Sequence, residues 1–453
     1  MKRIAIIGGG IAGVTAAFEL ARSGEPIEVV LFEASGRLGG IVETVREQGF
    51  IIECGPDGWV TEKPWAQELA AELGLGGEVI CSNDATRKTY ILRDNALVAM
   101  PDGMRMMVPG DLGAVDASPL FSQAAKRAFH DELTRTAELM ASAPEVDESV
   151  ACFVRRHFGD EVLETVGAPL LSGVFGGDVE RLSVRAVMGP FVAMERQYGS
   201  LIVATRVRAK AGLKPVFTTL RSGVGTLIEA MVAAIPSGWI RLETAITSLA
   251  RTETGWLVDG AAFDAVLMTA PVDVAGGLLR GTDARAAELM RMEASSAVVV
   301  AFGFAESFEL SQGFGFLVPP EKTGGDSLLA ATFVDQKFEG RVPAGGRLLR
   351  AFFGGEVGAR LLDAPDATVT ELARGQLERI LGRLPEAVVT VVRRWPRSLP
   401  QYAVGHLERM AELDERVQGI GNLWLLGNGY RGVGLPDLVR DARSAVRECL
   451  GVS

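Results

Sequence analysis

The chain has 453 residues, of which 48% are hydrophobic and 23% are charged. This length allows more than one domain with a large core, and the composition excludes a disordered protein. The 57 acidic residues outnumber the 46 basic ones and give a net charge of −11. No nucleic-acid partner is expected, because phosphate binding needs a basic surface.

The small number of histidines and cysteines also excludes several kinds of site. The sequence has only three histidines, and its four cysteines lack metal-binding spacing, so no metal site is expected. The start of the sequence lacks the pattern of a secretory signal, which favours a reducing cytoplasm. No run of roughly 20 apolar residues is found. We therefore expect no transmembrane span and at most peripheral membrane contact.

The first 33 residues carry the pattern of a nucleotide-binding unit. Residues 3–7 are an apolar run that predicts a strand, and apolar side chains at helical spacing over 14–21 predict a helix. Residues 27–32 predict a second strand, which ends at Glu33. A strand, turn, helix and strand within about 30 residues are typical of the opening of a Rossmann-type domain.

The rest of the chain alternates between helical and strand-like composition. The expected elements are a helical block over 120–165, strands over 239–270 with a turn at 253–255, strands over 296–304 and 347–353, a helix over 366–382, a buried strand from Leu423, and a helix from about Leu435. Residues 100–108 carry four methionines, which we interpret as a core patch rather than a membrane contact.

The glycines after the first strand predict a bound dinucleotide. Gly8, Gly10 and Gly13 have GxGxxG spacing, and Glu33 follows Gly13 by 20 residues. Such glycines allow a tight turn and close approach to a pyrophosphate, the helix N-terminus holds the phosphates, and the acid accepts hydrogen bonds from a ribose. An acid at this position fits FAD or NAD rather than NADP. The alternative is a turn that holds no ligand.

Two further segments bear on the kind of cofactor. Arg37-Leu38-Gly39-Gly40 lies within reach of the same pyrophosphate and resembles the R-x-G-G motif of flavin amine oxidases and protoporphyrinogen oxidases, which favours FAD. Residues 427–437 (GNGYRGVGLPD) form a glycine-dense turn before a helix. The free N–H groups and positive dipole of that helix end can stabilise negative charge on a flavin. An ordinary helix start is the alternative. A side chain at Gly434 is expected to push the flavin away or to force an unfavourable backbone.

Taken together, these motifs resemble the oxygen-dependent porphyrinogen oxidases of heme biosynthesis. Residues 395–406 (WPRSLPQYAVGH) alone suggest only a proline-rich loop, but followed by the 427–437 turn they match that family. Residues 171–183 (LSGVFGGDVERLS) add to the likeness, with Gly176 where the family has alanine. The family includes protoporphyrinogen IX and coproporphyrinogen III oxidases, and the resemblance spans essentially the whole chain.

The resemblance implies FAD-dependent oxidation of a porphyrinogen to the porphyrin, with six electrons removed in three flavin cycles, O2 as acceptor and H2O2 as product. It implies flavin contacts at Gly8, Gly9, Gly10, Ile11, Ala12, Gly13, Glu33, Ala34, Arg37, Gly39, Gly40, Gly55, Pro56, Asp57, Gly58, Ile246, Trp395, Asn428, Val433, Gly434 and Leu435. For the substrate it implies Gly173, over the ring, and Arg87, near a propionate, with Lys88 beside it. No side chain is assigned a catalytic role, because the flavin is the reactive group.

The expected fold is α/β, with a Rossmann-type FAD-binding domain, an interleaved α+β substrate domain with a mixed sheet, and a helical subdomain. The expected ranges are 1–68, 218–272 and 392–453 for FAD, 69–100, 200–217 and 273–391 for the substrate, and 101–199 for the helices.

Three other functions are alternatives: two share the N-terminal motifs, and the third, a binding protein, uses a similar two-domain fold. A flavin amine oxidase or a carotenoid desaturase lacks the PQY and GVGLPD segments, and a binding protein like the Rab GDP-dissociation inhibitors needs no intact flavin motif. The sequence leaves open which porphyrinogen is oxidised and which oligomer forms.

Overall fold

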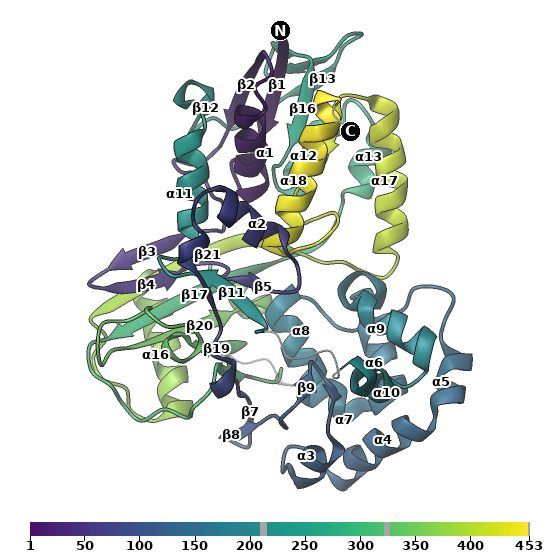
Figure 1. Cartoon of the computed structure of the whole chain (residues 1–453), viewed down its shortest axis with the longest axis vertical. Helices are drawn as coiled ribbons and strands as arrows, with labels where there is room; N and C mark the ends of the chain where they lie inside the picture. The colour runs from purple at the N-terminus through teal and green to yellow at the C-terminus, as the bar shows by residue number, and fades with distance from the viewer. Residues whose placement is uncertain (209–214, 321–326, 452–453) are drawn as a thin grey trace.

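The computed structural model describes residues 1–208, 215–320 and 327–451. The expected domain ranges include 209–214, 321–326 and 452–453, which lie outside the described residues. Figure 1 shows three regions: a sheet flanked by helices that holds both chain termini, a second large sheet below it, and a group of helices beside that second sheet. The predicted α/β class is confirmed.

The first region contains a five-stranded sheet with the order β12-β2-β1-β16-β22. All four pairs of neighbouring strands are parallel. The strands are β1 (Lys2–Ile7), β2 (Ile27–Phe32), β12 (Ile240–Arg241), β16 (Ala265–Met268) and β22 (Leu423–Leu425). Residues near the start, middle and end of the chain therefore build one sheet, as a Rossmann-type domain from both ends of the chain requires.

Helices and a small sheet cover the two faces of this parallel sheet. Ile4 and Ile6 of β1 pack in one core with α1 (Ile11–Arg22), α2 (Trp65–Glu72), α11 (Gly225–Ala234) and α18 (Leu435–Leu450). Ala5 and Ile7 point to the opposite core. That core lies under α12 (Val272–Leu279), α13 (Ala284–Leu289), α17 (His406–Ile420) and the sheet of β13 (Leu249–Arg251), β14 (Trp256–Val258) and β15 (Ala261–Phe263). Burial on both faces explains why residues 4–7 of β1 are all apolar.

The second region contains a seven-stranded sheet with the order β21-β17-β20-β19-β18-β7-β8. Its strands are β7 (Thr89–Arg93), β8 (Ala96–Ala99), β17 (Ala294–Phe304), β18 (Gly315–Leu317), β19 (Ala330–Phe333), β20 (Arg347–Phe353) and β21 (Val389–Pro400). The β18–β7 pair is parallel and the other pairs are antiparallel, so the sheet is mixed, as expected. The helices α14 (Val334–Lys337), α15 (Gly355–Arg360) and α16 (Asp366–Leu381) lie against it.

The third region is helical. It contains α3 (Leu112–Ala117), α4 (Gln123–Thr134), α5 (Thr136–Ser142), α6 (Val150–Phe158), α7 (Asp160–Val162), a π-helical turn (Leu163–Gly167), α8 (Ala168–Phe175), α9 (Val184–Tyr198) and α10 (Leu201–Arg208). Met107 is fully buried in its core, and Met100, Met104 and Met106 pack against that core, which agrees with a core patch. Among the described residues, no helix has the length and apolar character needed to cross a membrane.

The remaining strands form small sheets of two or three strands. They are β3 (Thr44–Glu47) with β4 (Phe50–Glu53), β5 (Trp59–Val60) and β6 (Val79–Cys81) with β11 (Phe217–Leu220), and β9 (Met104–Arg105) with β10 (Val108–Pro109). Four expected domain boundaries fall inside single elements: 68/69 in α2, 217/218 in β11, 272/273 in α12 and 391/392 in β21. In addition, α10 packs in the helical core although 200–217 was expected in the substrate domain. The exact domain ranges stay a prediction.

Candidate cofactor site

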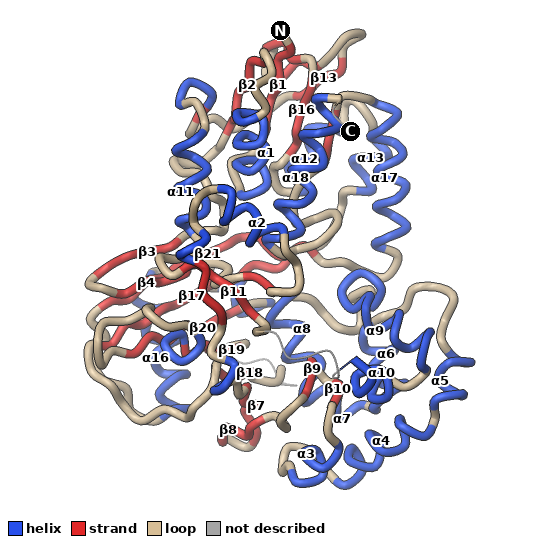
Figure 2. The backbone as a smooth tube through the Cα atoms, in the orientation of Figure 1, coloured by secondary structure: helices blue, strands red, loops and turns tan. Residues whose placement is uncertain are grey.

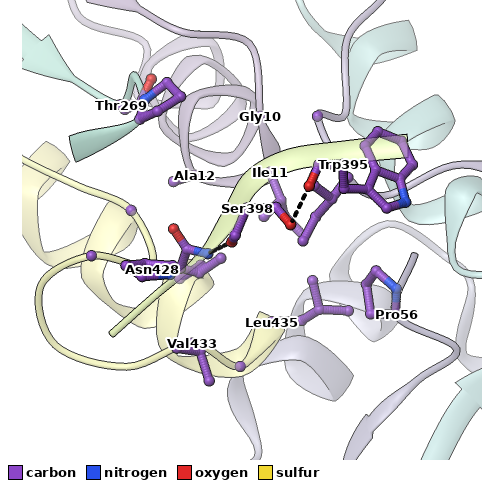
Figure 3. A pocket seen from close by; sticks show the side chains of 18 of the residues that line it. Gly10, Ile11, Ala12, Pro56, Thr269, Trp395, Ser398, Asn428, Val433 and Leu435 are labelled. Atoms are coloured by element: carbon purple, nitrogen blue, oxygen red, sulfur yellow. Dashed lines mark hydrogen bonds between the residues drawn. The ribbon is translucent and has the colours of Figure 1, made fainter. Parts of the chain in front are cut away.

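A cavity of about 470 Å³ lies where the parallel sheet meets the seven-stranded sheet. Its walls come from the first glycine turn, the start of α1, the end of β21, and the turn before α18 (Figure 3). The volume is in the range of small-molecule sites, roughly 300–1,000 Å³. Of the predicted flavin residues, those that line it are Gly8, Gly9, Gly10, Ile11, Ala12, Glu33, Gly39, Gly40, Pro56, Asp57, Gly58, Trp395, Asn428, Val433, Gly434 and Leu435.

The three motif glycines are each required for a different reason. Gly8 has a φ of +115°, which favours glycine, and a Cβ there would lie 2.7 Å from the backbone nitrogen of Ala270. A Cβ on Gly13 would lie 2.0 Å from the oxygen of Gly8, so Gly13 allows α1 to pack on β1. A Cβ on Gly10 would meet no atom within 4 Å. Gly10 therefore leaves open the space in front of the α1 N-terminus, where a phosphate would bind.

Glu33 is held in place at the carboxyl end of β2. Its Oε2 accepts a hydrogen bond from the backbone nitrogen of Gly9 at 2.6 Å, and its Oε1 accepts one from the backbone nitrogen of Ser35 at 2.8 Å. Each carboxylate oxygen can accept a further bond. The carboxylate therefore suits a ribose diol in the cavity that it lines.

Arg37 stabilises the loop of the R-x-G-G motif in this structure. Its guanidinium donates to the carbonyl oxygens of Leu38, Gly40 and Val42 and lies 5.7 Å from the centre of the Trp395 ring. The backbone nitrogen of Gly39 donates to the oxygen of Gly9 at 2.8 Å, so the two glycine motifs are joined. Arg37 itself does not line the cavity, and its contact with the pyrophosphate stays a prediction.

Four other predicted flavin residues also lie outside the cavity lining. Gly13 and Gly55 lie one layer behind it, and a Cβ on Gly55 would be 1.9 Å from the oxygen of Ile41. Ala34 is exposed beyond Glu33. Ile246 packs against the core that lies on the far face of β1. Direct flavin contacts by these residues stay predictions.

The turn before α18 opens on the cavity. The helix begins at Leu435, and Gly434, Leu435, Pro436 and Leu438 line the wall, so the positive end of the helix dipole faces the cavity. The expectation of an unfavourable backbone at Gly434 is wrong, because its φ of −79° and ψ of 146° suit any residue. The residue of this turn that needs to be glycine is Gly432, because its φ is +151° and a Cβ there would lie 2.8 Å from Cγ of Asp437.

The PQY and GH residues hold this turn in shape. The Tyr402 hydroxyl donates to the oxygen of Asn428 at 2.6 Å and accepts from the backbone nitrogen of Gly432 at 3.1 Å. His406 Nε2 donates to the oxygen of Tyr430 at 2.9 Å, and the rings of Tyr402 and His406 stack at 3.9 Å. Burial lowers the pKa of His406 to about 4, so the imidazole is neutral. This motif therefore positions the turn that faces the cavity.

Figure 3 shows how the turn is joined to the end of β21. The Asn428 side chain donates to the oxygen of Ser398 at 2.8 Å, and the Ser398 hydroxyl donates to the oxygen of Trp395 at 3.1 Å. The Trp395 indole donates to the oxygen of Cys54 at 2.7 Å, next to the segment with Pro56. These hydrogen bonds thus join the turn before α18, the end of β21 and the segment after β4, which come from distant parts of the sequence.

The sequence analysis missed the wall formed after β16. Thr269 hydroxyl donates to the oxygen of Gly8, at 2.6 Å, and so fixes the first glycine turn. Parallel strands end at one edge of a sheet, so the residues after 265–268 were detectable in principle. The lining residues that were not predicted are Ile41, Trp59, Val60, Phe217, Thr269, Ala270, Pro271, Val272, Asp273, Ala294, Pro396, Arg397, Ser398, Pro400, Gly427, Pro436 and Leu438, whereas Gly429 and Tyr430 belong to the predicted turn from Asn428 to Leu435.

The predicted substrate residues do not line the cavity. Gly173 is exposed on α8, which ends at Phe175. The oxygen of the next residue, Gly176, accepts from Gln401 Nε2 at 2.9 Å, next to the cavity residue Pro400. A Cβ on Gly176 would lie 2.7 Å from Leu399 Cδ1, and the φ of Gly176 is +63°. Arg87 is exposed after a short helical turn. Both substrate roles stay predictions.

The donor groups of the site fit a flavin dinucleotide. The open space before α1, the fixed carboxylate of Glu33 and the N-terminus of α18 supply, in one cavity, sites for a pyrophosphate, a ribose and a ring that becomes negative. Among the described residues, no group of His, Cys, Asp and Glu side chains has a metal-binding arrangement.

Known proteins resemble the chain over its full length. The coproporphyrinogen III oxidase of Bacillus subtilis (strain 168) is 33% identical over 99% of this chain and 98% of its own length. Protoporphyrinogen oxidase 1, chloroplastic, of Arabidopsis thaliana is 28% identical over 96% of this chain and 86% of its own length. A crystal structure described as a protoporphyrinogen oxidase from Exiguobacterium sp. 255-15 has a TM-score of 0.86 and 32% identity, and covers 99% of this chain and 98% of that one.

A more distant structure, the cyclohexylamine oxidase of Brevibacterium oxydans IH-35A, has a TM-score of 0.72 at 15% identity and covers 99% of each chain, and it supports the fold alone. The model of the family "Flavin containing amine oxidoreductase" matches residues 11–450. The predicted cofactor, FAD, and the predicted class, an oxidoreductase, are thereby confirmed. The chain belongs to the flavin containing amine oxidoreductase family.

Proposed function

We propose that this protein oxidises a porphyrinogen to the porphyrin with O2 as acceptor, and that coproporphyrinogen III is its substrate. The observation that carries the proposal is the bonding of Tyr402 and His406 to the 428–432 turn, because those residues belong to the motifs that set porphyrinogen oxidases apart from amine oxidases. The name of the Bacillus subtilis relative favours coproporphyrinogen III. Protoporphyrinogen IX, named in the plant relative, is the second candidate.

Bound FAD supplies the acceptor for the hydrogens lost from the meso bridges. The protein has three tasks in this proposal. The α1 N-terminus and Glu33 bind the pyrophosphate and ribose of the dinucleotide. The α18 N-terminus presents its dipole to the part of the site where negative charge develops. Tyr402 and His406 keep the turn before α18 in the position that this interaction requires.

The proposed reaction does not depend on a general acid or base supplied by the protein. His406 is buried and neutral, and its Nε2 hydrogen is used by Tyr430. Aromatisation of the ring drives the reaction, and pyrrole N–H protons can leave to water. Binding and orientation of a flexible tetrapyrrole next to the flavin are then the main contributions of the chain. The substrate contacts of Gly173 and Arg87 remain part of this proposal.

We further propose a cytoplasmic enzyme without a nucleic-acid partner. The net charge of −11 supports the absence of a nucleic-acid partner, because binding of phosphates needs an excess of basic residues. All four cysteines are free thiols, and this supports a reducing compartment. Fractionation of cells that express the protein would check the location, and recovery in a salt-resistant membrane fraction would contradict it.

The function is tested with purified protein and the two porphyrinogens side by side. Porphyrin fluorescence and H2O2 formation should rise together with either substrate, and faster with coproporphyrinogen III. Monoamines and diamines serve as alternative substrates in the same assay. Oxidation of an amine without formation of porphyrin from either porphyrinogen would replace this proposal by the amine oxidase alternative.

A further inference from the structure

A largely buried group of charged residues lies at the cavity wall and directly behind it, and Asp57 is its one member that lines the cavity. We call it the cation cluster and define it as Glu53, Asp57, Lys337, Arg341 and Arg350. Arg341, Arg350 and Glu53 are each at most 2% exposed. The cluster holds three cations and two carboxylates, so it has a formal excess of one positive charge. Burial raises the pKa of Glu53 and lowers the pKa of Arg341, so it opposes the charged form of one acid and of one base in the cluster.

Lys337, at the end of α14, connects the cluster to the cavity. Its Nζ lies 2.8 Å from Oδ2 and 3.0 Å from Oδ1 of Asp57, and 4.5 Å from the centre of the Phe217 ring. Asp57 and Phe217 both line the cavity. The Lys337 side chain is only 11% exposed. Its charge is therefore one layer of side chains away from the cavity and poorly screened by solvent.

Arg350 of β20 supports the same segment from the other side. Its guanidinium donates to the oxygen of Gly55, and its Nη1 lies 3.5 Å from Oδ2 of Asp57. Burial opposes ionisation of Asp57, but Lys337 and Arg350 outweigh it and hold the pKa of Asp57 below its usual range. Two cations of the second region thus hold the segment 55–58 of the cavity wall.

We propose that Lys337 is a positioning residue that holds Asp57 and that the positive excess of the cation cluster makes the bound flavin easier to reduce. Reduction adds negative charge to the flavin, and a nearby buried positive charge stabilises that state. This inference rests on the proposed function in one respect: it requires that FAD binds in this cavity. It assigns the tuning to a part of the chain far from the glycine motifs.

Two substitutions separate an electrostatic effect from a merely structural one. Lys337→Met removes one positive charge, and Asp57→Asn removes one negative charge from the same ion pair. An electrostatic role predicts opposite shifts of the flavin midpoint potential, downward for Lys337→Met and upward for Asp57→Asn. If the pair only holds the backbone, both substitutions loosen the same segment and shift the potential in the same direction.

The experiment measures the midpoint potential of the bound flavin by dye equilibration under anaerobic conditions. We expect each variant to change the equilibrium constant of the two-electron reduction at least about fivefold, which is about 20 mV at 29.6 mV per tenfold change. Lys337→Arg keeps the charge and should restore the potential. Lys126→Met makes the same chemical change at a half-buried position of α4, in the helical region, and should leave the potential unchanged.

The outcomes separate this inference from the proposed function. Shifts in the same direction, or none in either variant, would overturn the inference, and porphyrin formation by the wild type would still stand. A wild-type protein that holds flavin but yields no porphyrin would overturn the proposed function and leave the potentials measurable. If Lys337→Met does not fold, the upward shift in Asp57→Asn still decides, because a downward shift there contradicts the role of the charge.

Discussion

Replacement of Gly10 by alanine tests whether the α1 N-terminus binds the pyrophosphate. A Cβ at this position would meet no protein atom within 4 Å, and the φ of −68° suits alanine. A lower entropy of the unfolded chain stabilises the variant by about 0.4–1 kcal/mol, and the poorer N-cap offsets part of this gain. The free energy of unfolding of the flavin-free protein should therefore change by less than about 1 kcal/mol.

The same methyl group should strongly weaken FAD binding, because it fills the space that a phosphate needs at this helix end. Loss of one hydrogen bond to a charged group costs about 1.5–3 kcal/mol, which corresponds to a roughly 10- to 100-fold higher dissociation constant. Gly10→Val should remove more of the affinity, because its side chain fills more of the same space.

The assay combines two measurements on the purified variant. Flavin content and a titration of the flavin-free protein with FAD give the affinity, and denaturant unfolding gives the stability. Gly77→Ala, in open space on a distant turn, is the matched control and should bind FAD normally. Stoichiometric flavin and wild-type affinity in Gly10→Ala and Gly10→Val would refute the assignment of the α1 N-terminus.

Three further predictions concern side chains of the same cavity. Glu33→Ala should raise the dissociation constant of FAD by a factor that corresponds to about 1–3 kcal/mol in the same titration, and unchanged binding would argue against a ribose contact. Tyr402→Phe leaves the oxygen of Asn428 and the nitrogen of Gly432 without their partner, so the free energy of unfolding should fall by about 1–3 kcal/mol in urea. His406 has a pKa of about 4 in the folded chain, below its unfolded value, so only the unfolded chain takes up a proton as the pH falls from about 6.5 to 4. Stability should therefore decrease by about 3 kcal/mol across this window at 1.36 kcal/mol per pH unit, and His406→Gln should show a smaller decrease; an equal slope in both proteins would contradict this role.

The sequence was most informative where one local pattern has one physical cause. GxGxxG followed by Glu33 fixes a turn, a helix N-terminus and a strand end within one continuous segment, and the structure has each of them in the predicted order. Strands over 239–270 were predicted, yet the wall that follows the last of them, β16, was not. Which strand lies next to β1 depends on long-range pairing, and no local pattern reports that.

The turn before α18 shows the same limit at the level of single residues. Its glycine content predicted special backbone, but only the folded turn distinguishes Gly432, with positive φ, from Gly434, with ordinary φ. Likewise, the residue types of Tyr402 and His406 did not by themselves indicate their role, because they bind backbone atoms of Asn428, Tyr430 and Gly432. Long-range contacts to backbone leave no side-chain pattern in the sequence.

The most direct test of the account is an anaerobic titration of the purified, flavin-loaded protein with coproporphyrinogen III. The account predicts that the absorbance of oxidised flavin disappears as porphyrinogen is added, and that admission of O2 restores this absorbance and releases H2O2 as porphyrin fluorescence appears. Flavin that stays oxidised in the presence of both coproporphyrinogen III and protoporphyrinogen IX would contradict the account.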